Sequence, residues 1–244
     1  MKAIMDTTYI SPPDITAPVS SPVTFEFVTE STPIDLVHQY FQLRQDVFTN
    51  YWHLKQFAGD EDEYDKMSVI LLMCHQNTCV GGARIVIRPA YSDIYLPMET
   101  ADFLVTRLLP DLHLEGKNYV EICRLAILPE FMNGSHSTEL YYQLACKCKE
   151  LNISYAFGVS PILQARKIRI ACRSFGMDTK ICNDIAIPPL ATYEGITMRL
   201  TVMDVASWNN HIVESLKQTA LNQNTPPNLV LKQEEGSTEP TVST

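Results

Sequence analysis

The sequence has few of the features that mark metal-binding, secreted or membrane-spanning proteins. Its seven cysteines are an odd number and form no C-x-x-C pair, which argues against a zinc site or a disulfide framework. No uncharged apolar run approaches the roughly 18 residues of a membrane span. The first twenty residues lack the basic and apolar segments of a secretory signal. We therefore expect a cytoplasmic protein with no bound metal and no membrane span.

Positive charge is also scarce. The formal net charge is -9 at pH 7, whereas a general nucleic-acid binder is normally basic, so we expect no nucleic-acid partner. Hydrophobic residues make up 45% of the 244 positions and charged residues 19%, as in ordinary globular domains. Composition predicts a flexible Pro/Ser/Thr-rich leader at 1–23, one domain at 24–218 and a disordered polar tail at 219–244.

Hydrophobic periodicity predicts strands and helices that succeed one another along the chain, as in an α/β (α+β) domain. The expected elements are strand 24–29, helix 33–48, strands 68–74 and 80–87, loop 91–109 with a short helix after it, strand 119–127, helix 138–151, strand 153–159, helix 163–175, strands 181–187 and 196–202, and a short amphipathic helix with Val205, Trp208, Ile212 and Leu216. Gly81 and Gly82 indicate a bulge or a close approach of two backbones.

The strand at 119–127, reading YVEICRLAI, carries two charged residues among apolar neighbours. A regular strand directs Glu121 and Arg124, three positions apart, to opposite faces of the sheet. Either one of them faces a functional site, or a bulge brings both round to it. A structural ion pair is the alternative, because a buried charge is costly unless it is paired or used.

Arg44 is a second charge in an unexpected place. It falls near the middle of the apolar arc of helix 33–48, where a surface arginine does not belong. Two interpretations remain open for it: pairing in the core, or a position lining a pocket.

Two clusters of like charge are also notable. Five carboxylates lie between residues 60 and 65, either in a solvated loop or as a recognition site for a cationic ligand: Asp60, Glu61, Asp62, Glu63 and Asp65. Helix 163–175 carries four cations and no acid, either as a solvated face or as a dock for an acidic macromolecule: Arg166, Lys167, Arg169 and Arg173.

The order of elements resembles the GNAT acyltransferase fold, which implies a mixed central sheet flanked by helices. The residue pattern is similar to that of the acyl-homoserine-lactone (autoinducer) synthases. The similarity is strongest over residues 43–128. It rests on Arg44 and Phe48 at R-x-x-x-F spacing, Trp52, Asp62 and Asp65, Arg84 after the double glycine, Phe103, and Glu121 with Arg124 at E-x-x-R spacing. Trp52 stands closer to Phe48 than the tryptophan of that family does.

The resemblance implies transfer of a fatty acyl group from the thioester of acyl carrier protein to an amine. In autoinducer synthases the amine belongs to S-adenosylmethionine, and lactone formation then expels methylthioadenosine. Glu121 is the candidate base or proton relay, with Arg124 and Arg84 holding the substrates or carboxylates. The amine side would comprise Arg44, Phe48, Trp52, Asp62, Asp65 and Phe103. Only co-substrates are implied, and no bound cofactor.

The acyl donor and the amine each have an alternative. The segment PEFMNGSHST holds one glycine where acetyl-CoA-dependent GNAT enzymes carry a glycine-rich pyrophosphate loop, which favours a carrier protein docked on helix 163–175. The segment after residue 128 is also similar to N-acyl amino acid synthases, which acylate a free amino acid such as tyrosine. An acetyl-CoA-dependent N-acetyltransferase and a non-enzymatic binding module are the remaining readings.

Overall fold

The computed structural model describes residues 22–132, 135–188, 193 and 196–209. Almost all of the expected leader and the whole tail therefore lie outside the described residues, as do Ile212 and Leu216. Val205 and Trp208 are buried in a turn rather than in the short helix that we expected. The reason is that the Val205 N–H donates a hydrogen bond to the carbonyl of Ser154, a partner outside any local helix.

The described residues form a seven-stranded mixed sheet in the order β1-β2-β3-β4-β5-β7-β6. Every neighbouring pair is antiparallel except β4 and β5, which are parallel. The strands are β1 Val23–Phe27, β2 Ser68–His75, β3 Thr78–Arg88, β4 Tyr119–Ile127, β5 Tyr155–Pro161, β6 Thr179–Cys182 and β7 Met198–Asp204. A mixed sheet is the fold class that the sequence predicts, so this expectation is confirmed.

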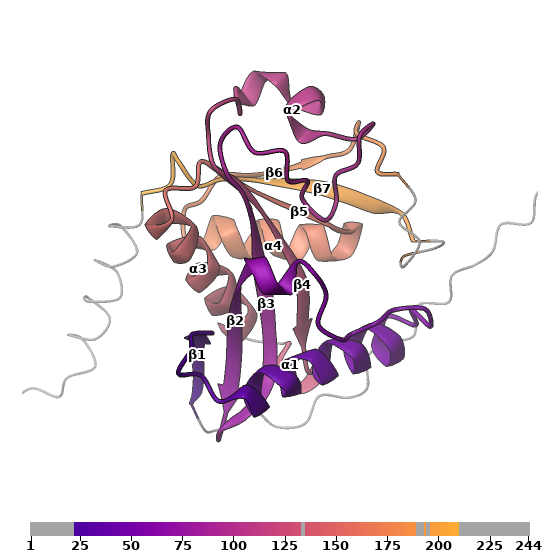
Figure 1. The fold of residues 1–244 in the computed structure, drawn as a ribbon, viewed down its shortest axis with the longest axis vertical. Coiled ribbons are helices and arrows are strands. Elements are labelled where there is room, and N and C mark those ends of the chain that lie inside the picture. Colours follow the sequence, from indigo (N-terminus) through magenta and orange to yellow (C-terminus); the bar gives the residue numbers. More distant parts are fainter. Residues whose placement is uncertain (1–21, 133–134, 189–192, 194–195, 210–244) are drawn as a thin grey trace, which may run out of the picture. The chain divides into compact units, whose positions relative to one another are not determined.

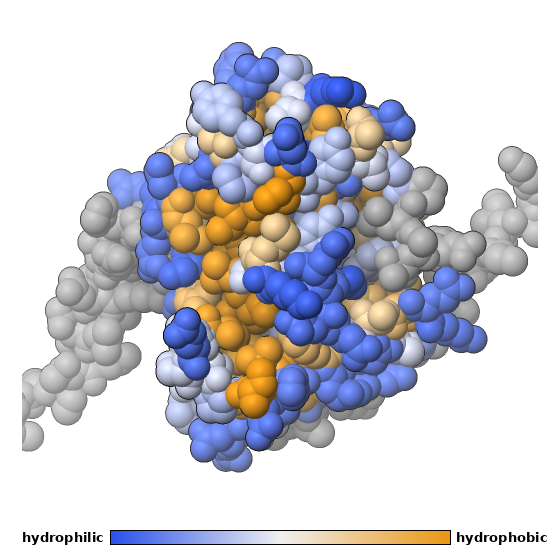
Figure 2. All heavy atoms as spheres, in the orientation of Figure 1, coloured by the Kyte–Doolittle hydropathy of each residue, from blue (hydrophilic) through white to orange (hydrophobic). Residues whose placement is uncertain are grey.

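Helices cover both faces of this sheet (Figure 1). α1 packs against β2, β3 and β4 on one face, whereas α3 and α4 pack together on the other. The α-helices are α1 Ile34–Asp46, α2 Val105–Leu108, α3 Ser135–Glu150 and α4 Ile162–Ser174; a π-helix, η1 Val47–Tyr51, continues α1; and three 3₁₀ turns are η2 Asp65–Met67, η3 Pro110–Leu112 and η4 Pro129–Phe131. Hydrophilic residues gather along α1 and over η2 (Figure 2).

Several boundaries differ from those expected, among them those of β5, α3 and β6. β5 continues through Ser160 and Pro161, because both residues still pair with β7. Proline is tolerated here because it is the last residue of the strand. α3 begins at Ser135, three residues before the expected start at 138. β6 ends at Cys182, and the apolar residues that follow, among them Ile185, pack against the core without joining the ladder.

Candidate active site

A cavity opens where β4 and β5 separate. The two parallel strands pair only from Tyr119↔Tyr155 to Glu121↔Phe157, and the ladder then stops. A cavity of about 550 Å³, within the range of small-molecule sites, is lined by residues of both strands beyond this point. Its lining also includes side chains of η1 and of the loop before η2 on one face of the sheet, and side chains of α3 and α4 on the other. The cavity therefore passes through the sheet between the diverging strands.

A β-bulge in β4 directs the two charged residues of that strand into the cavity. Arg84 of β3 pairs with Cys123, but Gly82 pairs with Ala126, so two residues of β4 oppose one of β3. Arg124 adopts φ 55°, in the left-handed region that few non-glycine residues occupy. Glu121 and Arg124 both line the cavity as a result. Of the two geometries that the sequence left open, this confirms the one with a bulge.

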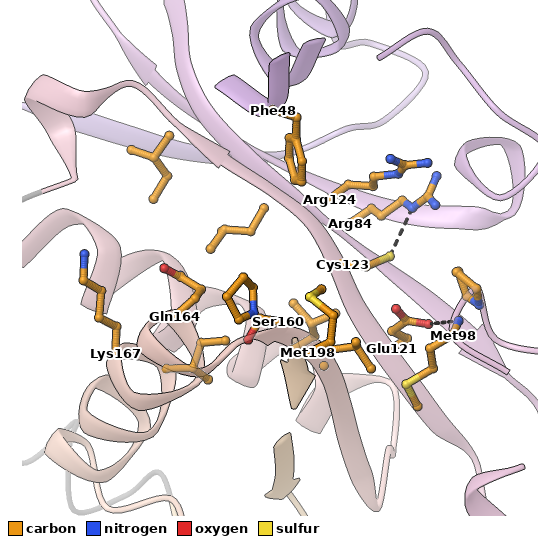
Figure 3. Close-up of a pocket in the computed structure, with 18 of the residues that line it drawn as sticks. Phe48, Arg84, Met98, Glu121, Cys123, Arg124, Ser160, Gln164, Lys167 and Met198 are labelled. Carbon is orange, nitrogen blue, oxygen red and sulfur yellow. Dashed lines mark hydrogen bonds between the residues drawn. The ribbon is translucent and has the colours of Figure 1, made fainter. Parts of the chain in front are cut away.

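Glu121 is buried at the polar end of the cavity, and 4% of its surface is exposed. Its Oε2 accepts a hydrogen bond from the backbone N–H of Met98 at 2.8 Å (Figure 3). Burial disfavours the carboxylate and raises the pKa of Glu121 to about 7, although the Met98 hydrogen bond opposes this effect. A carboxyl group with such a pKa can accept a proton near neutral pH and release it again.

Arginines and aspartates alternate in a series of ion pairs that ends at Arg124. Arg44 of α1 donates two hydrogen bonds to Asp65, at 2.6 and 2.9 Å. Asp65 also accepts from Arg84 of β3 at 2.8 Å, and Arg84 donates in turn to Asp62. The other oxygen of Asp62 lies 3.4 Å from the guanidinium of Arg124. These contacts fix the guanidinium groups of β3 and β4 relative to helix α1.

Some of these five arginines and aspartates line the cavity, and the others lie behind its wall. Asp62, Arg84 and Arg124 line it, whereas Arg44 and Asp65 do not. Arg44 is fully buried, so its pairing in the core is the interpretation that holds. The expectation of a solvated loop is wrong for Asp65, which is 5% exposed. Although burial opposes ionisation, the arginine hydrogen bonds hold the pKa of Asp65 below its ordinary value.

Phe103 is likewise absent from the cavity lining. It is buried in a turn, where its backbone exchanges two hydrogen bonds with Thr100. Its expected contact with the substrate stays a prediction.

Aromatic residues form the wall beside Arg124. Phe48 and Trp52 line the cavity, as expected, together with Tyr64 and Tyr193. Phe48 lies in the π-helix η1, whose extra residue per turn is a common feature of functional sites. The ring of Tyr193 meets that of Phe48 edge-on, with centroids 6.2 Å apart. Sequence reasoning missed Tyr193, because it lies between β6 and β7 outside any periodic or charged pattern.

The other end of the cavity lies between α3 and α4. The Gln164 amide donates a hydrogen bond to the Tyr141 hydroxyl at 3.0 Å, and apolar residues such as Ile168 surround the pair. Lys167 and Ile170 also contribute to the lining, and Ile170 is 68% exposed. The outer surface of α4 therefore adjoins the cavity (Figure 3).

Of the four basic residues on α4, only Lys167 lines the cavity. Arg166, Lys167 and Arg173 are exposed, and Arg169 is half-buried. The guanidinium of Arg173 lies 3.9 Å from Asp178, in an exposed ion pair of little energetic weight.

Cys123 is the thiol closest to these charges. The Arg84 Nε–H donates to its Sγ at 3.2 Å. Burial raises the pKa of Cys123 to about 12, so the residue stays a protonated thiol and is a poor nucleophile near neutral pH. Within the described ranges, no group of three His, Cys, Asp or Glu side chains is placed to hold a metal ion.

The mixed sheet, the separation of β4 from β5 and the bulge at Arg124 define a domain of the GNAT acyltransferase fold. The family model of the acetyltransferase (GNAT) domain matches residues 43–141.

Two solved structures specify the similarity further. BjaI, a CoA-dependent acyl-homoserine lactone synthase solved with SAM and isopentyl-CoA, is 16% identical, with a TM-score of 0.54 over 80% of this chain and 89% of that chain. The acyl-homoserine lactone synthase LasI is 18% identical, with a TM-score of 0.51 over 76% of this chain and 91% of that chain. The resemblance drawn from sequence motifs is thus confirmed at the level of the fold.

No curated protein sequence matches the chain. None of the helices in the described part is both long and apolar enough to cross a membrane.

Proposed function

We propose that this protein is an N-acyltransferase that moves a fatty acyl group from a pantetheine thioester to the amine of an amino-acid-derived substrate. The observation that carries the proposal is the cavity between β4 and β5, which joins an apolar region at α3 and α4 to a polar end with Glu121 and Arg124. Such a shape suits a long acyl thioester whose reacting carbonyl lies next to a base.

The thioester arm is expected to lie along the separated strands. Beyond Glu121 and Phe157, the facing edges of β4 and β5 have no ladder bonds to each other. Backbone N–H and C=O groups of this kind need partners, and the amides of an extended pantetheine arm can supply them. At Gly158 a Cβ atom would lie 3.4 Å from the Ile122 carbonyl oxygen, so the glycine leaves room beside that oxygen.

The chemical step needs no covalent enzyme intermediate. The neutral amine attacks the thioester carbonyl, a C–N bond forms, and the C–S bond breaks as the tetrahedral intermediate collapses. Glu121 takes the proton that the attacking nitrogen loses, and the departing thiolate takes up a proton to leave as a thiol. The protonated state of Cys123 is consistent with direct attack, since a thiol with its pKa raised to about 12 does not compete as nucleophile.

The amine side fits a molecule with an amino acid portion. Nη1 of Arg124 is buried and has no hydrogen-bond partner among the described residues, so it is available to a carboxylate. The neighbouring rings of Phe48, Trp52 and Tyr193 suit a cation such as the sulfonium of S-adenosylmethionine. With that substrate, the acylated product would close to an N-acyl-homoserine lactone and release methylthioadenosine. A free amino acid such as tyrosine, packed against the same rings, is the second candidate.

The donor is proposed to be acyl carrier protein. α4 offers exposed cations next to two exposed apolar side chains, Leu163 and Ile170, and Ile170 adjoins the cavity. An acidic carrier that docked here would present its thioester at the cavity entrance. Acyl-CoA is the competing donor, because BjaI is a CoA-dependent enzyme and so is MesI, which is 15% identical, with a TM-score of 0.51 over 80% of this chain and 94% of that chain.

The proposal is tested by combining each acyl donor with each amine acceptor. The purified chain is incubated with acyl carrier protein thioesters, acyl-CoA or acetyl-CoA, each with S-adenosylmethionine or tyrosine, and products are identified by mass spectrometry. We expect N-acyl-homoserine lactones from the carrier protein, and none from Glu121→Gln. N-acyl amino acids would establish the second candidate, and acetylated products the acetyl-CoA reading. No product from any pair would overturn acyl transfer.

A further inference from the structure

The bulge residue of β4 has a backbone group that the sheet does not use. Arg124 lies where two residues of β4 oppose one of β3, and a residue in this position falls out of the regular ladder. Its left-handed backbone, φ 55°, is an unfavourable conformation for a non-glycine residue and persists only where the surroundings enforce it. Something beyond β3 must therefore hold the bulge.

Tyr40 of α1 makes that contact. It is fully buried, and its hydroxyl donates a hydrogen bond of 2.8 Å to the backbone carbonyl of Arg124. The two residues are 84 positions apart, so the bond joins the helix on one face of the sheet directly to the irregular point of β4. The hydroxyl thus gives the carbonyl of this residue, which has no paired residue on β3, a hydrogen-bond partner outside the sheet.

Gly82 allows the tyrosine to reach β4. A Cβ atom at position 82 would lie 2.8 Å from the ring of Tyr40, closer than side chains tolerate. The close backbone approach that the sequence indicated is found between Gly82 and the Leu71 carbonyl of β2, 2.7 Å from where a Cβ would stand, and the Tyr40 ring packs beside it. On α1, one turn further along, the guanidinium carbon of Arg44 lies 5.5 Å from the Tyr40 ring centroid. Helix α1 thus contacts the bulge through the Tyr40 hydroxyl. It contacts the series of arginine–aspartate ion pairs through the Arg44 guanidinium.

We propose that Tyr40 is a positioning residue that holds the β4 bulge, so that Arg124 and Glu121 face the same cavity. It does not line the cavity, so it acts through Arg124. The bulge supplies the alignment of Glu121 with Arg124, which a regular strand would send to opposite faces. The kinetic part of this inference rests on the proposed acyl transfer, whereas the conformational part does not.

Tyr40→Phe tests the inference, because it keeps the ring over Gly82 and removes only the hydroxyl. Trp208→Phe is the matched control: its indole N–H donates to the Phe175 carbonyl at 2.9 Å, so it also loses a buried bond from an aromatic ring to the backbone, away from the cavity. Both variants should melt at a lower temperature than wild type. Gly82→Ala is a second variant, which keeps the hydroxyl but crowds both the tyrosine ring and the Leu71 carbonyl of β2.

We expect Tyr40→Phe to lower kcat about 10- to 100-fold, the effect typical of a misplaced catalytic group, with the KM for the acyl donor unchanged. The midpoint of its pH–rate profile should also move, because the distance from Arg124 to Glu121 changes. Trp208→Phe should keep the wild-type kcat and midpoint. A wild-type kcat in both Tyr40→Phe and Gly82→Ala would overturn the inference, as would an equal loss in Trp208→Phe.

Hydrogen–deuterium exchange separates this inference from the proposed function. We expect faster exchange over residues 119–128 in Tyr40→Phe and not in Trp208→Phe, whatever reaction the wild type catalyses. Unchanged exchange in that segment would overturn the positioning role even if acyl transfer is confirmed. Absence of turnover in the wild type would overturn the proposed function alone, and the exchange data would then decide the conformational part.

Discussion

Arg44 and Asp65 form a two-pronged ion pair that joins helix α1 to the turn before β2. Both side chains are almost completely buried, at 0% and 1% exposure, and the two hydrogen bonds are 2.9 and 2.6 Å long. The pair lies behind the cavity wall, where Asp65 also accepts a hydrogen bond from Arg84. The sequence motifs place Arg44 and Asp65 on the substrate side. In the structure the pair is connected to the cavity through Arg84.

This relationship predicts a non-additive effect on stability. Arg44→Met should destabilise the fold by about 3–5 kcal/mol, because it leaves Asp65 buried with one of its two arginines gone. The double variant Arg44→Met with Asp65→Leu should lose less than the sum of the single variants. Denaturant unfolding of the three proteins measures this. Strict additivity would contradict the idea that the two charges depend on each other.

Glu121 predicts a pH-dependent rate. Its carboxylate form is the base, so kcat/KM should rise with pH and level off above about 7, where burial has placed its pKa. Glu121→Gln should reduce kcat on the order of 100- to 10,000-fold while the fold is kept. A pH–rate profile of wild type against this variant is the measurement. Near-normal turnover of the variant would remove Glu121 from the mechanism.

The same residue predicts a pH dependence of stability. The folded-state pKa of Glu121, about 7, lies above its ordinary value of 4.5, so the folded protein binds this proton more tightly than the unfolded chain does. This contribution is fully present below pH 4.5 and is lost as the pH rises to about 7. Glu121→Gln should therefore show a flatter stability curve between these pH values in urea titrations. A slope identical to that of the wild type would contradict the raised pKa.

Tyr193 predicts an effect on one substrate only. Its ring lies edge-on to Phe48 on the proposed amine side, so Tyr193→Leu should raise the KM for the amine about 10-fold, a loss of about 1.4 kcal/mol. The KM for the acyl donor should be unchanged. Tyr91→Leu is the control, because Tyr91 is 92% exposed and does not line the cavity. Equal changes in both KM values would show that Tyr193 does not distinguish the substrates.

The basic surface of α4 predicts which donor is used. Reversal of the two exposed charges that do not line the cavity, Arg166→Glu with Arg173→Glu, should raise the KM for an acyl carrier protein on the order of 10- to 100-fold and weaken its salt dependence. The KM for a free acyl-pantetheine should change little. Arg107→Glu, on the exposed part of α2, is the control for charge reversal away from α4. An unchanged KM for the carrier protein would move its docking surface elsewhere.

Periodicity determined most of the fold in advance. β4 has the bounds that the sequence predicts, because β-branched and aromatic residues stand at both ends of the segment, at Tyr119, Val120 and Ile127, and the strand is buried there. The boundaries that shifted, at β6 and at the start of α3, are those where polar residues leave the local preference weak. Glu121 and Arg124 were identifiable because charges in an apolar strand need a partner or a use.

The sequence by itself thus predicted the strands and helices and showed charged residues within apolar elements. It also showed a resemblance to the GNAT acyltransferases. Only the tertiary structure decided which charges face the cavity. It places Arg44 behind the wall with Asp65, and brings Tyr193 in from a segment without any pattern. It also shows Tyr40 bonded to a backbone carbonyl 84 positions away. Such long-range contacts depend on how helices and strands pack together, and local sequence patterns do not record packing between distant segments.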